Sequence, residues 1–265
     1  MNTECLLGFF MKKTREKAIV LIFLCIAVFL AACAPTALQK ERSEAFLHKG
    51  VSFIELRQYP NALRELMEAE KYNPQDERIY YHKGIVYHAM NMKEKAFESF
   101  QRAISIKNDY SEAHNYLGTL YNAEGMWDKA IEHFDKAVAN PLYTTPALPL
   151  YNAGWAYYSK KDYKKAMDSY VRALQREPET VLRPQIQKFI GKIYFDQSDY
   201  NNAIKHLRQA VTLDPSLFDA HFFLGESYLK IMDKTNAKKA FQSVIDLAPK
   251  SSFGKKASDY LQSLK

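Results

Sequence analysis

The sequence is poor in cysteine and lacks the short motifs of common enzymes. All three cysteines, Cys5, Cys25 and Cys33, precede residue 34, so the rest of the chain has no disulfide, thiolate metal site or cysteine nucleophile. No HExxH, GxSxG, P-loop or Rossmann glycine pattern occurs, and these motifs mark the chemistry of large enzyme classes. We therefore expect no enzyme, no cofactor and no small-molecule substrate.

The sequence also lacks a strong charge and a set of metal ligands. Its 37 Lys and Arg residues exceed its 30 Asp and Glu residues by only seven. No basic run interleaved with aromatics follows one helix face, so the footprint of a nucleic-acid partner is missing. His48 and His82 are candidates to lie near one another, but no third ligand accompanies them at a suitable spacing. We expect neither a nucleic-acid partner nor a metal site.

The first part of the chain has the layout of an export signal. Four Lys and Arg residues between positions 12 and 17 precede an apolar stretch over residues 18–29, and small residues follow. Because this signal is complete from Met11 onward, we expect translation to start there. The alternative is a transmembrane anchor, since the apolar run over residues 18–34 reaches the lower limit of a spanning helix.

The end of that signal, Leu30, Ala31, Ala32 and Cys33, resembles the bacterial lipobox. The resemblance implies a signal peptide over residues 1–32, acylation of Cys33 and a lipidated linker over 33–42. Two or three acyl chains hold a protein stably on a membrane, whereas one chain binds reversibly. Ala34 in place of Asp resembles Gram-negative lipoproteins that reach the outer membrane, while a Gram-positive host would keep the protein on the cytoplasmic membrane.

Glycine is scarce as well, yet most of it recurs at a fixed interval. Six of the nine glycines are spaced by 34, 34, 36, 37 and 34 residues: Gly50, Gly84, Gly118, Gly154, Gly191 and Gly225. With each of them at position 8 of a unit, position 11 is aromatic, position 24 is bulky, and position 20 is always alanine. This pattern matches the tetratricopeptide repeat (TPR), a helical hairpin of about 34 residues.

The pattern predicts an all-α protein, an α-solenoid that winds into a right-handed superhelix. Gly and Ala allow two helix backbones to approach closely, and each hairpin has an apolar face that only its neighbour covers. The TPR domain is predicted over 43–265, with repeats at 43–76, 77–110, 111–144, 147–180, 184–217 and 218–251 and a capping helix at 252–265. The prolines of the stretch 139–155 fall between repeats or in a first helical turn, where they are tolerated.

A partner-binding groove is predicted on the concave side, at positions 2, 5, 9 and 12 of each first helix. The candidate residues are Leu47, Val51, Ile54, Tyr81, Ile85, Asn115, Asn122, Tyr151, Trp155 and Tyr158. Tyr and Trp are enriched at interface hot spots, which favours Tyr151, Trp155 and Tyr158 as the anchor. Asn115 and Asn122 are candidates to bond a peptide backbone. The alternative is that some of these side chains pack against neighbouring helices.

The stretch NPLYTTPALPLYNAG, residues 140–154, resembles the DPLYPTPA…NAG segment between repeats three and four of the PilF/PilW family, the type IV pilus pilotins. The lipobox, the six repeats and the short cap extend the resemblance. It implies a lipoprotein on the periplasmic face of the outer membrane, anchored through Cys33, that helps the pilus secretin to assemble into its ring. The secretin is then the protein partner, and the early repeats, closest to the lipid, are the natural place to hold it.

Two other functions remain open from the sequence. A lipid-anchored TPR adaptor for peptidoglycan enzymes would have the same anchor and repeats. A subunit of the envelope machinery that assembles β-barrels also fits, although such subunits usually have fewer repeats.

Overall fold

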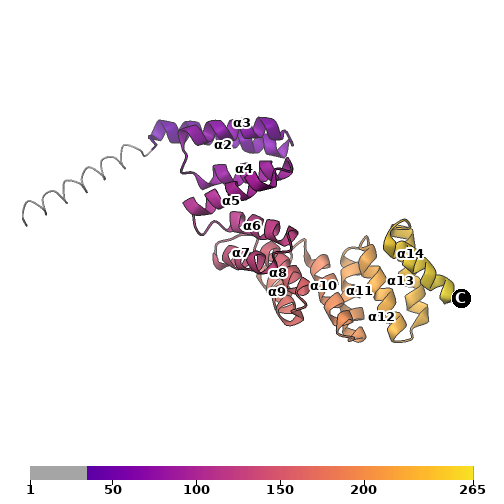
Figure 1. The fold of residues 1–265 in the computed structure, drawn as a ribbon. Helices are drawn as coiled ribbons and strands as arrows, with labels where there is room; N and C mark the ends of the chain where they lie inside the picture. The colour runs from indigo at the N-terminus through magenta and orange to yellow at the C-terminus, as the bar shows by residue number, and fades with distance from the viewer. Residues whose placement is uncertain (1–34, 265) are drawn as a thin grey trace, which may run out of the picture. The chain divides into compact units, whose positions relative to one another are not determined.

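The computed structural model describes residues 35–264, and this part of the chain is helical, without strands. Its helices are α2 (Ala37–Glu55), α3 (Tyr59–Tyr72), α4 (Glu77–Ala89), α5 (Lys93–Ile106), α6 (Ser111–Ala123), α7 (Trp127–Ala139), α8 (Ala147–Ser159), α9 (Tyr163–Arg176), α10 (Arg183–Asp196), α11 (Tyr200–Leu213), α12 (Phe218–Lys230), α13 (Lys234–Leu247) and α14 (Ser252–Ser263) (Figure 1). None of these helices is long and apolar enough to cross a membrane. The predicted signal peptide and Cys33 lie outside the described residues.

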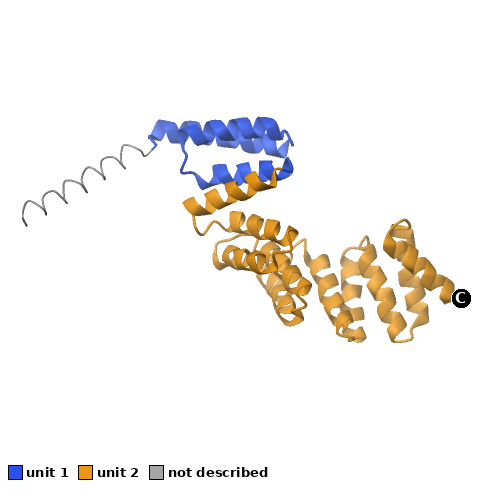
Figure 2. Cartoon of the chain, viewed as in Figure 1, with its two compact units in different colours: residues 1–91 blue, residues 92–265 orange. Residues whose placement is uncertain are grey.

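The chain divides into two compact units, residues 1–91 and residues 92–265 (Figure 2). The described part of unit 1 contains α2, α3 and α4, and unit 2 contains α5 to α14. The boundary falls between α4 and α5, inside the second predicted repeat. In each unit, helices that follow one another in sequence pack as antiparallel neighbours, which is the arrangement of a helical-repeat solenoid.

Each predicted repeat contains two helices, and the predicted cap contains one. The first helix differs from the prediction at its start, because α2 begins at Ala37 and takes up part of the segment 33–42 assigned to a linker. Thr36 caps this helix through a capping box with Gln39, which satisfies backbone N–H groups at the helix start. Pro149 lies in the first turn of α8, where the missing N–H has no helical partner to lose.

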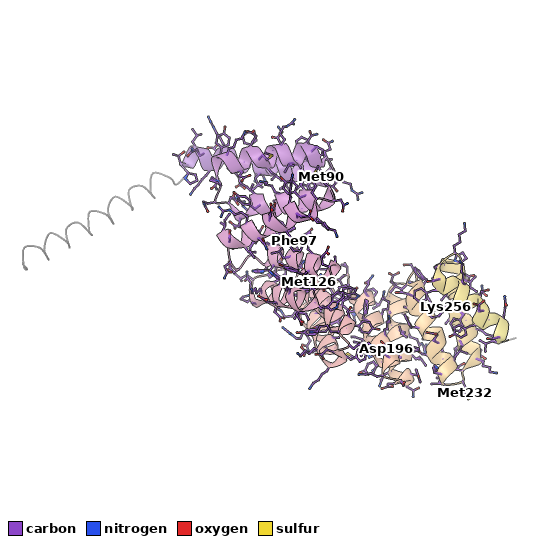
Figure 3. The ribbon with its side chains drawn as sticks, viewed as in Figure 1. Met90, Phe97, Met126, Asp196, Met232 and Lys256 are labelled. Carbon is purple, nitrogen blue, oxygen red and sulfur yellow. The ribbon has the colours of Figure 1, made fainter. Side chains whose placement is uncertain are left out.

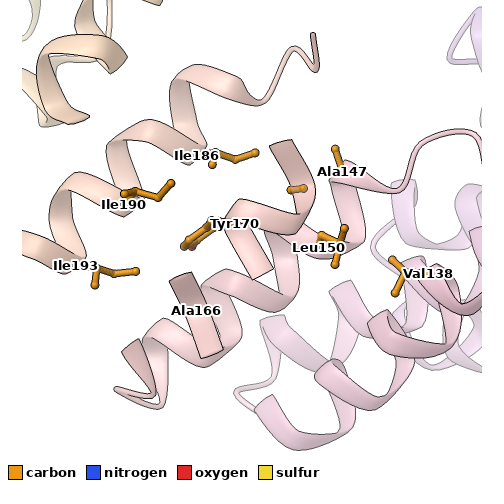
Figure 4. Packing of buried hydrophobic residues seen from close by; sticks show 9 residues of the cluster. Val138, Ala147, Leu150, Ala166, Tyr170, Ile186, Ile190 and Ile193 are labelled. Atoms are coloured by element: carbon orange, nitrogen blue, oxygen red, sulfur yellow. The ribbon is translucent and has the colours of Figure 1, made fainter. Parts of the chain in front are cut away.

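The recurring glycine of each first helix lies against the bulky residue of the second. A Cβ atom added to Gly154 would lie 2.6 Å from Cε1 of Tyr170, and one added to Gly118 would lie 2.5 Å from Cε1 of Phe134. Both large side chains are almost fully buried, and the alanines at position 20 are buried completely. Tyr170 lies in a cluster that joins α7, α8, α9 and α10 (Figure 4). The sequence predicted a close approach of the two helices, and the structure shows that the bulky residue at position 24 meets the glycine at position 8.

The turn inside every repeat contains one residue in the left-handed backbone region, always at position 15. These residues are Arg57, Asn91, Gly125, Lys161, Ser198 and Met232, with φ between 56° and 71°. In the fourth repeat the N–H of Asp162 donates to the carbonyl of Tyr157 at 2.9 Å, which closes the end of α8 as a Schellman motif. Only Asn91 and Gly125 are residue types that favour this conformation, so the sequence does not reveal the turn.

Candidate binding face on the first helices

The first helices of successive repeats lie side by side in unit 2. Helix α6 contacts α8, α8 contacts α10, α10 contacts α12, and α12 contacts the cap α14. We call the surface formed by these five helices the A-helix face. It contains the positions at which sequence analysis expected a groove, and it is the candidate functional site of this unit.

In unit 1 the predicted groove residues contribute mostly to the core. Leu47 is only 3% exposed and lies in a cluster with residues of α3 and α4, so its assignment to an open groove was wrong. Val51 and Ile54 are half-buried and pack against the same cluster. The reason is that α2 contacts both α3 and α4, which cover this side of the helix. Tyr81 and Ile85 on α4 are half-buried.

The two predicted asparagines of α6 are also buried. Asn115 is 5% exposed and Asn122 is 8% exposed, and the Oδ1 atom of each has no hydrogen-bond partner among residues 35–264. The side-chain amide of Asn122 donates to the carbonyl of Asn152 on α8 at 3.4 Å. These short side chains lie between helices, where a bound peptide cannot reach them. The prediction that they bond a peptide backbone was therefore wrong.

The predicted aromatic anchor of α8 separates into two parts. Tyr151 and Tyr158 both contact Phe189 of α10, with ring centroids 5.9 Å apart in each case. Trp155 instead meets Trp127, the first residue of α7, edge to face at 5.2 Å. All of these side chains are half-buried, so each keeps part of its surface open to a partner.

A set of half-buried rings, in two groups that Lys192 connects, runs from α8 to α12. We call it the aromatic patch, and its members are Tyr151, Tyr158, Phe189, Phe195 and Phe223. Lys192 lies across its middle, with Nζ 5.2 Å from the ring centre of Tyr158 and 4.8 Å from that of Phe223. Cation–π contacts of this kind hold the ammonium group between the rings and connect α8 with α12.

Tyr158 also bonds an acidic residue at the end of α10. Its hydroxyl donates to Oδ2 of Asp196 at 2.5 Å. Burial, and then this hydrogen bond to a carboxylate, raise the pKa of Tyr158 above the ordinary range of tyrosine. The hydroxyl of Tyr158 therefore stays a proton donor at every physiological pH.

Phe189 and Phe223 are the members that sequence reasoning missed. Both occupy position 6, which the template of positions 2, 5, 9 and 12 leaves out. In the structure, position 6 of one repeat meets position 12 of the repeat before it, as Phe223 meets Phe195 at 5.7 Å. The signal in the sequence was an aromatic residue at position 6 of repeats five and six.

The described residues contain no metal centre among the histidines, cysteines and acids. No group of three or more such side chains in residues 35–264 is arranged to hold an ion. His48 instead pairs with Glu44, 3.0 Å away on the same helix. The face offers aromatic rings, a lysine and carboxylates, a composition that suits contacts with another polypeptide.

Comparison with protein families identifies the repeat. Models of the tetratricopeptide repeat match residues 77–110, 147–180 and 219–251, and a TPR repeat model matches residues 191–231. The first two ranges coincide with the second and fourth repeats defined from glycine spacing. This repeat is typical of scaffolds for protein interaction.

Solved structures share the fold over most of the chain. PilF of Pseudomonas aeruginosa superimposes with a TM-score of 0.75 at 14% identity, over 84% of this chain and 99% of that one. PilW, described as a widely conserved type IV pilus biogenesis factor, gives a TM-score of 0.71 at 21% identity, over 82% and 98% of the two chains. YrrB, a TPR protein described as having an unusual peptide-binding site, gives 0.60 at 18% identity, over 73% and 97%.

Two curated proteins match part of the sequence. The human intraflagellar transport protein 88 homolog is 29% identical over 41% of this chain and 13% of its own length. The outer membrane protein assembly factor BamD of Rickettsia prowazekii is 25% identical over 41% of this chain and 47% of its own length. The chain thus spans less than half of the curated relatives it matches. The chain therefore contains tetratricopeptide repeats at the positions that the family models match and has the fold of PilF and PilW.

Proposed function

We propose that this protein is a lipid-anchored scaffold of the outer membrane that helps the type IV pilus secretin to reach that membrane and assemble. The observation that carries the proposal is the match of fold with PilF and PilW over nearly their whole lengths. The lipobox at Cys33 supplies the anchor in this proposal, and the aromatic patch supplies a surface for a secretin segment.

The aromatic patch suits this role because it combines apolar area with fixed polar groups. Tyr151, Tyr158 and Phe189 are held by mutual ring contacts, so they lose little side-chain entropy when a partner covers them. The hydroxyl of Tyr158 and the ammonium of Lys192 add polar groups at the same surface. Rigid aromatic groups with polar ends are the usual anchors of protein interfaces.

The anchoring half of the proposal is tested with Cys33→Ser in the full-length precursor. Without acyl chains the protein loses its membrane affinity, so secretin multimers should fall about tenfold while the helical circular dichroism spectrum stays unchanged. Cys25→Ala is the matched control, because it changes a cysteine of the signal and leaves the lipobox intact. Normal secretin multimers in the Cys33→Ser strain would rule out anchoring as part of the mechanism, and normal multimers in a deletion strain would rule out the pilotin role.

A second candidate is a general factor for the assembly of outer-membrane proteins. The partial similarity to BamD favours it. The same deletion strain separates the two functions, because a general factor would deplete many β-barrel proteins of the outer membrane, whereas a pilotin would deplete secretin multimers alone.

A further inference from the structure

A hollow of about 580 Å³ opens between α10, the start of α11, α12 and the cap α14. Its walls include the aromatic side chains Phe195, Tyr200 and Tyr260 and the carboxylates Asp196 and Glu226; Figure 3 labels Asp196. Phe195 belongs to both this hollow and the aromatic patch, so the two surfaces are continuous. A polypeptide segment that covers the patch would bring a neighbouring side chain to the hollow.

Within residues 35–264, the hydrogen bonds that the two carboxylates of the hollow accept come from tyrosine hydroxyls. Asp196 accepts from Tyr158 at 2.5 Å, and Glu226 accepts from Tyr260 at 3.0 Å. Among residues 35–264 neither carboxylate forms an ion pair, although Lys230 lines the same hollow. Each carboxylate has about four acceptor sites, so most of them are open to a ligand.

Another acid of the A-helix face shows the contrast. Asp219 of α12 is paired with Lys188 of α10 at 2.8 Å, and both side chains are largely buried. The charge of Asp219 is thus paired with a lysine, whereas in the described part of the chain Asp196 and Glu226 have neutral hydrogen-bond donors. The hollow is lined by two carboxylates and by the ammonium of Lys230, so its net charge is negative. A negative charge favours a cationic ligand.

The aromatic walls are held in place and suit a flat cation. Phe195 meets Tyr200 edge to face at 5.7 Å, and Tyr260 stacks on Phe241 at 4.8 Å with the two rings 14° from parallel. Guanidinium is planar, stacks on aromatic faces and donates several hydrogen bonds to carboxylates, whereas the ammonium of lysine is more strongly hydrated.

We propose that this hollow binds an arginine side chain presented by an extended segment of the protein partner. The proposal rests on the proposed function only in assuming a polypeptide partner. The carboxylates of Asp196 and Glu226 accept from the guanidinium, and the rings of Phe195, Tyr200 and Tyr260 flank it.

The test uses full-length protein in detergent and three fluorescein-labelled peptides that differ at one position. The probe is Gly-Ser-Leu-Val-Arg-Leu-Val-Ser-Gly with blocked ends, and its counterparts carry Gln or Lys in place of Arg. Fluorescence anisotropy gives the dissociation constants. We expect the Arg peptide to bind about tenfold more tightly than the Gln peptide, since a hydrogen-bonded charged contact contributes roughly 1.5–3 kcal/mol, and more tightly than the Lys peptide.

The double variant Asp196→Asn/Glu226→Gln removes both charges and keeps an acceptor oxygen for each tyrosine hydroxyl. We expect the Arg and Gln peptides to bind it equally. Asp168→Asn, an exposed acid on α9 away from the hollow, is the matched control and should keep the wild-type preference. The proposal would be overturned if the wild type bound the Arg peptide no more tightly than the Gln or Lys peptide, or if it bound none of them. A preference for the Arg peptide that persisted in the double variant would also overturn it. Secretin assembly is measured in a separate experiment, so failure of the peptide test can be distinguished from failure of the proposed function.

Discussion

Replacing Gly154 by alanine tests the packing rule on which every repeat depends. In an exposed helix interior this change stabilises a protein by about 0.5–1 kcal/mol, because alanine is the better helix former. Here the new Cβ would lie 2.6 Å from Cε1 and 2.8 Å from Cζ of Tyr170, well inside contact distance. We therefore expect Gly154→Ala to destabilise the protein.

The magnitude follows from how firmly the tyrosine ring is held. Tyr170 is fully buried and stacks on Phe189 at 5.8 Å with the two rings 18° from parallel, so the ring has no free space to enter. Overpacking of a core by one methyl group costs about 1–3 kcal/mol. After subtraction of the gain in helix propensity, Gly154→Ala should lower the free energy of unfolding by about 1 kcal/mol.

The assay is urea unfolding followed by circular dichroism, with hydrogen exchange of the α8 and α9 amides to locate the loss. In a repeat protein the loss should concentrate in these helices and their neighbours. The Tyr170→Ala background is the control, because it removes the ring atoms that the new methyl group would meet. There Gly154→Ala should become neutral or stabilising. A Gly154→Ala protein as stable as the wild type, or an equal effect in both backgrounds, would refute the packing argument.

Two other changes test buried polar groups of unit 2. The hydroxyl of Tyr170 is buried without a hydrogen-bond partner in the part of the chain that the structure describes, so Tyr170→Phe should raise the urea midpoint, with a gain of about 1 kcal/mol. Burial, and then the adjacent ring of His114, lower the pKa of His133 to about 4. Because the unfolded chain binds this proton near pH 6.5 and the folded protein only near pH 4, stability should fall as the pH drops from 7 to 5. His133→Gln should show a smaller fall in melting temperature over that range, and an equal fall would contradict the role of His133.

The sequence by itself determined the contacts inside each hairpin. The interval between glycines predicted the repeats, and the residue types at positions 8, 20 and 24 predicted a close approach of two helices with a large side chain between them. In the structure Gly154 lies against Tyr170. These contacts are local, since both helices of a hairpin belong to one 34-residue unit and a short turn fixes their alignment. A residue at a given position of the unit then meets the same position of the other helix in every repeat, and a small residue indicates a large neighbour.

Only the tertiary structure decided which side chains of the first helices stay open. Leu47, Asn115 and Asn122 occupy groove positions of the template but are buried, while Phe189, outside the template, joins Tyr151 to Tyr158. The physical reason is that burial on this face depends on how closely successive repeats approach. Many contacts between neighbouring repeats together set that distance. No offset within one repeat encodes that distance, so the aromatic patch and the acidic hollow became visible only when the helices were placed beside one another.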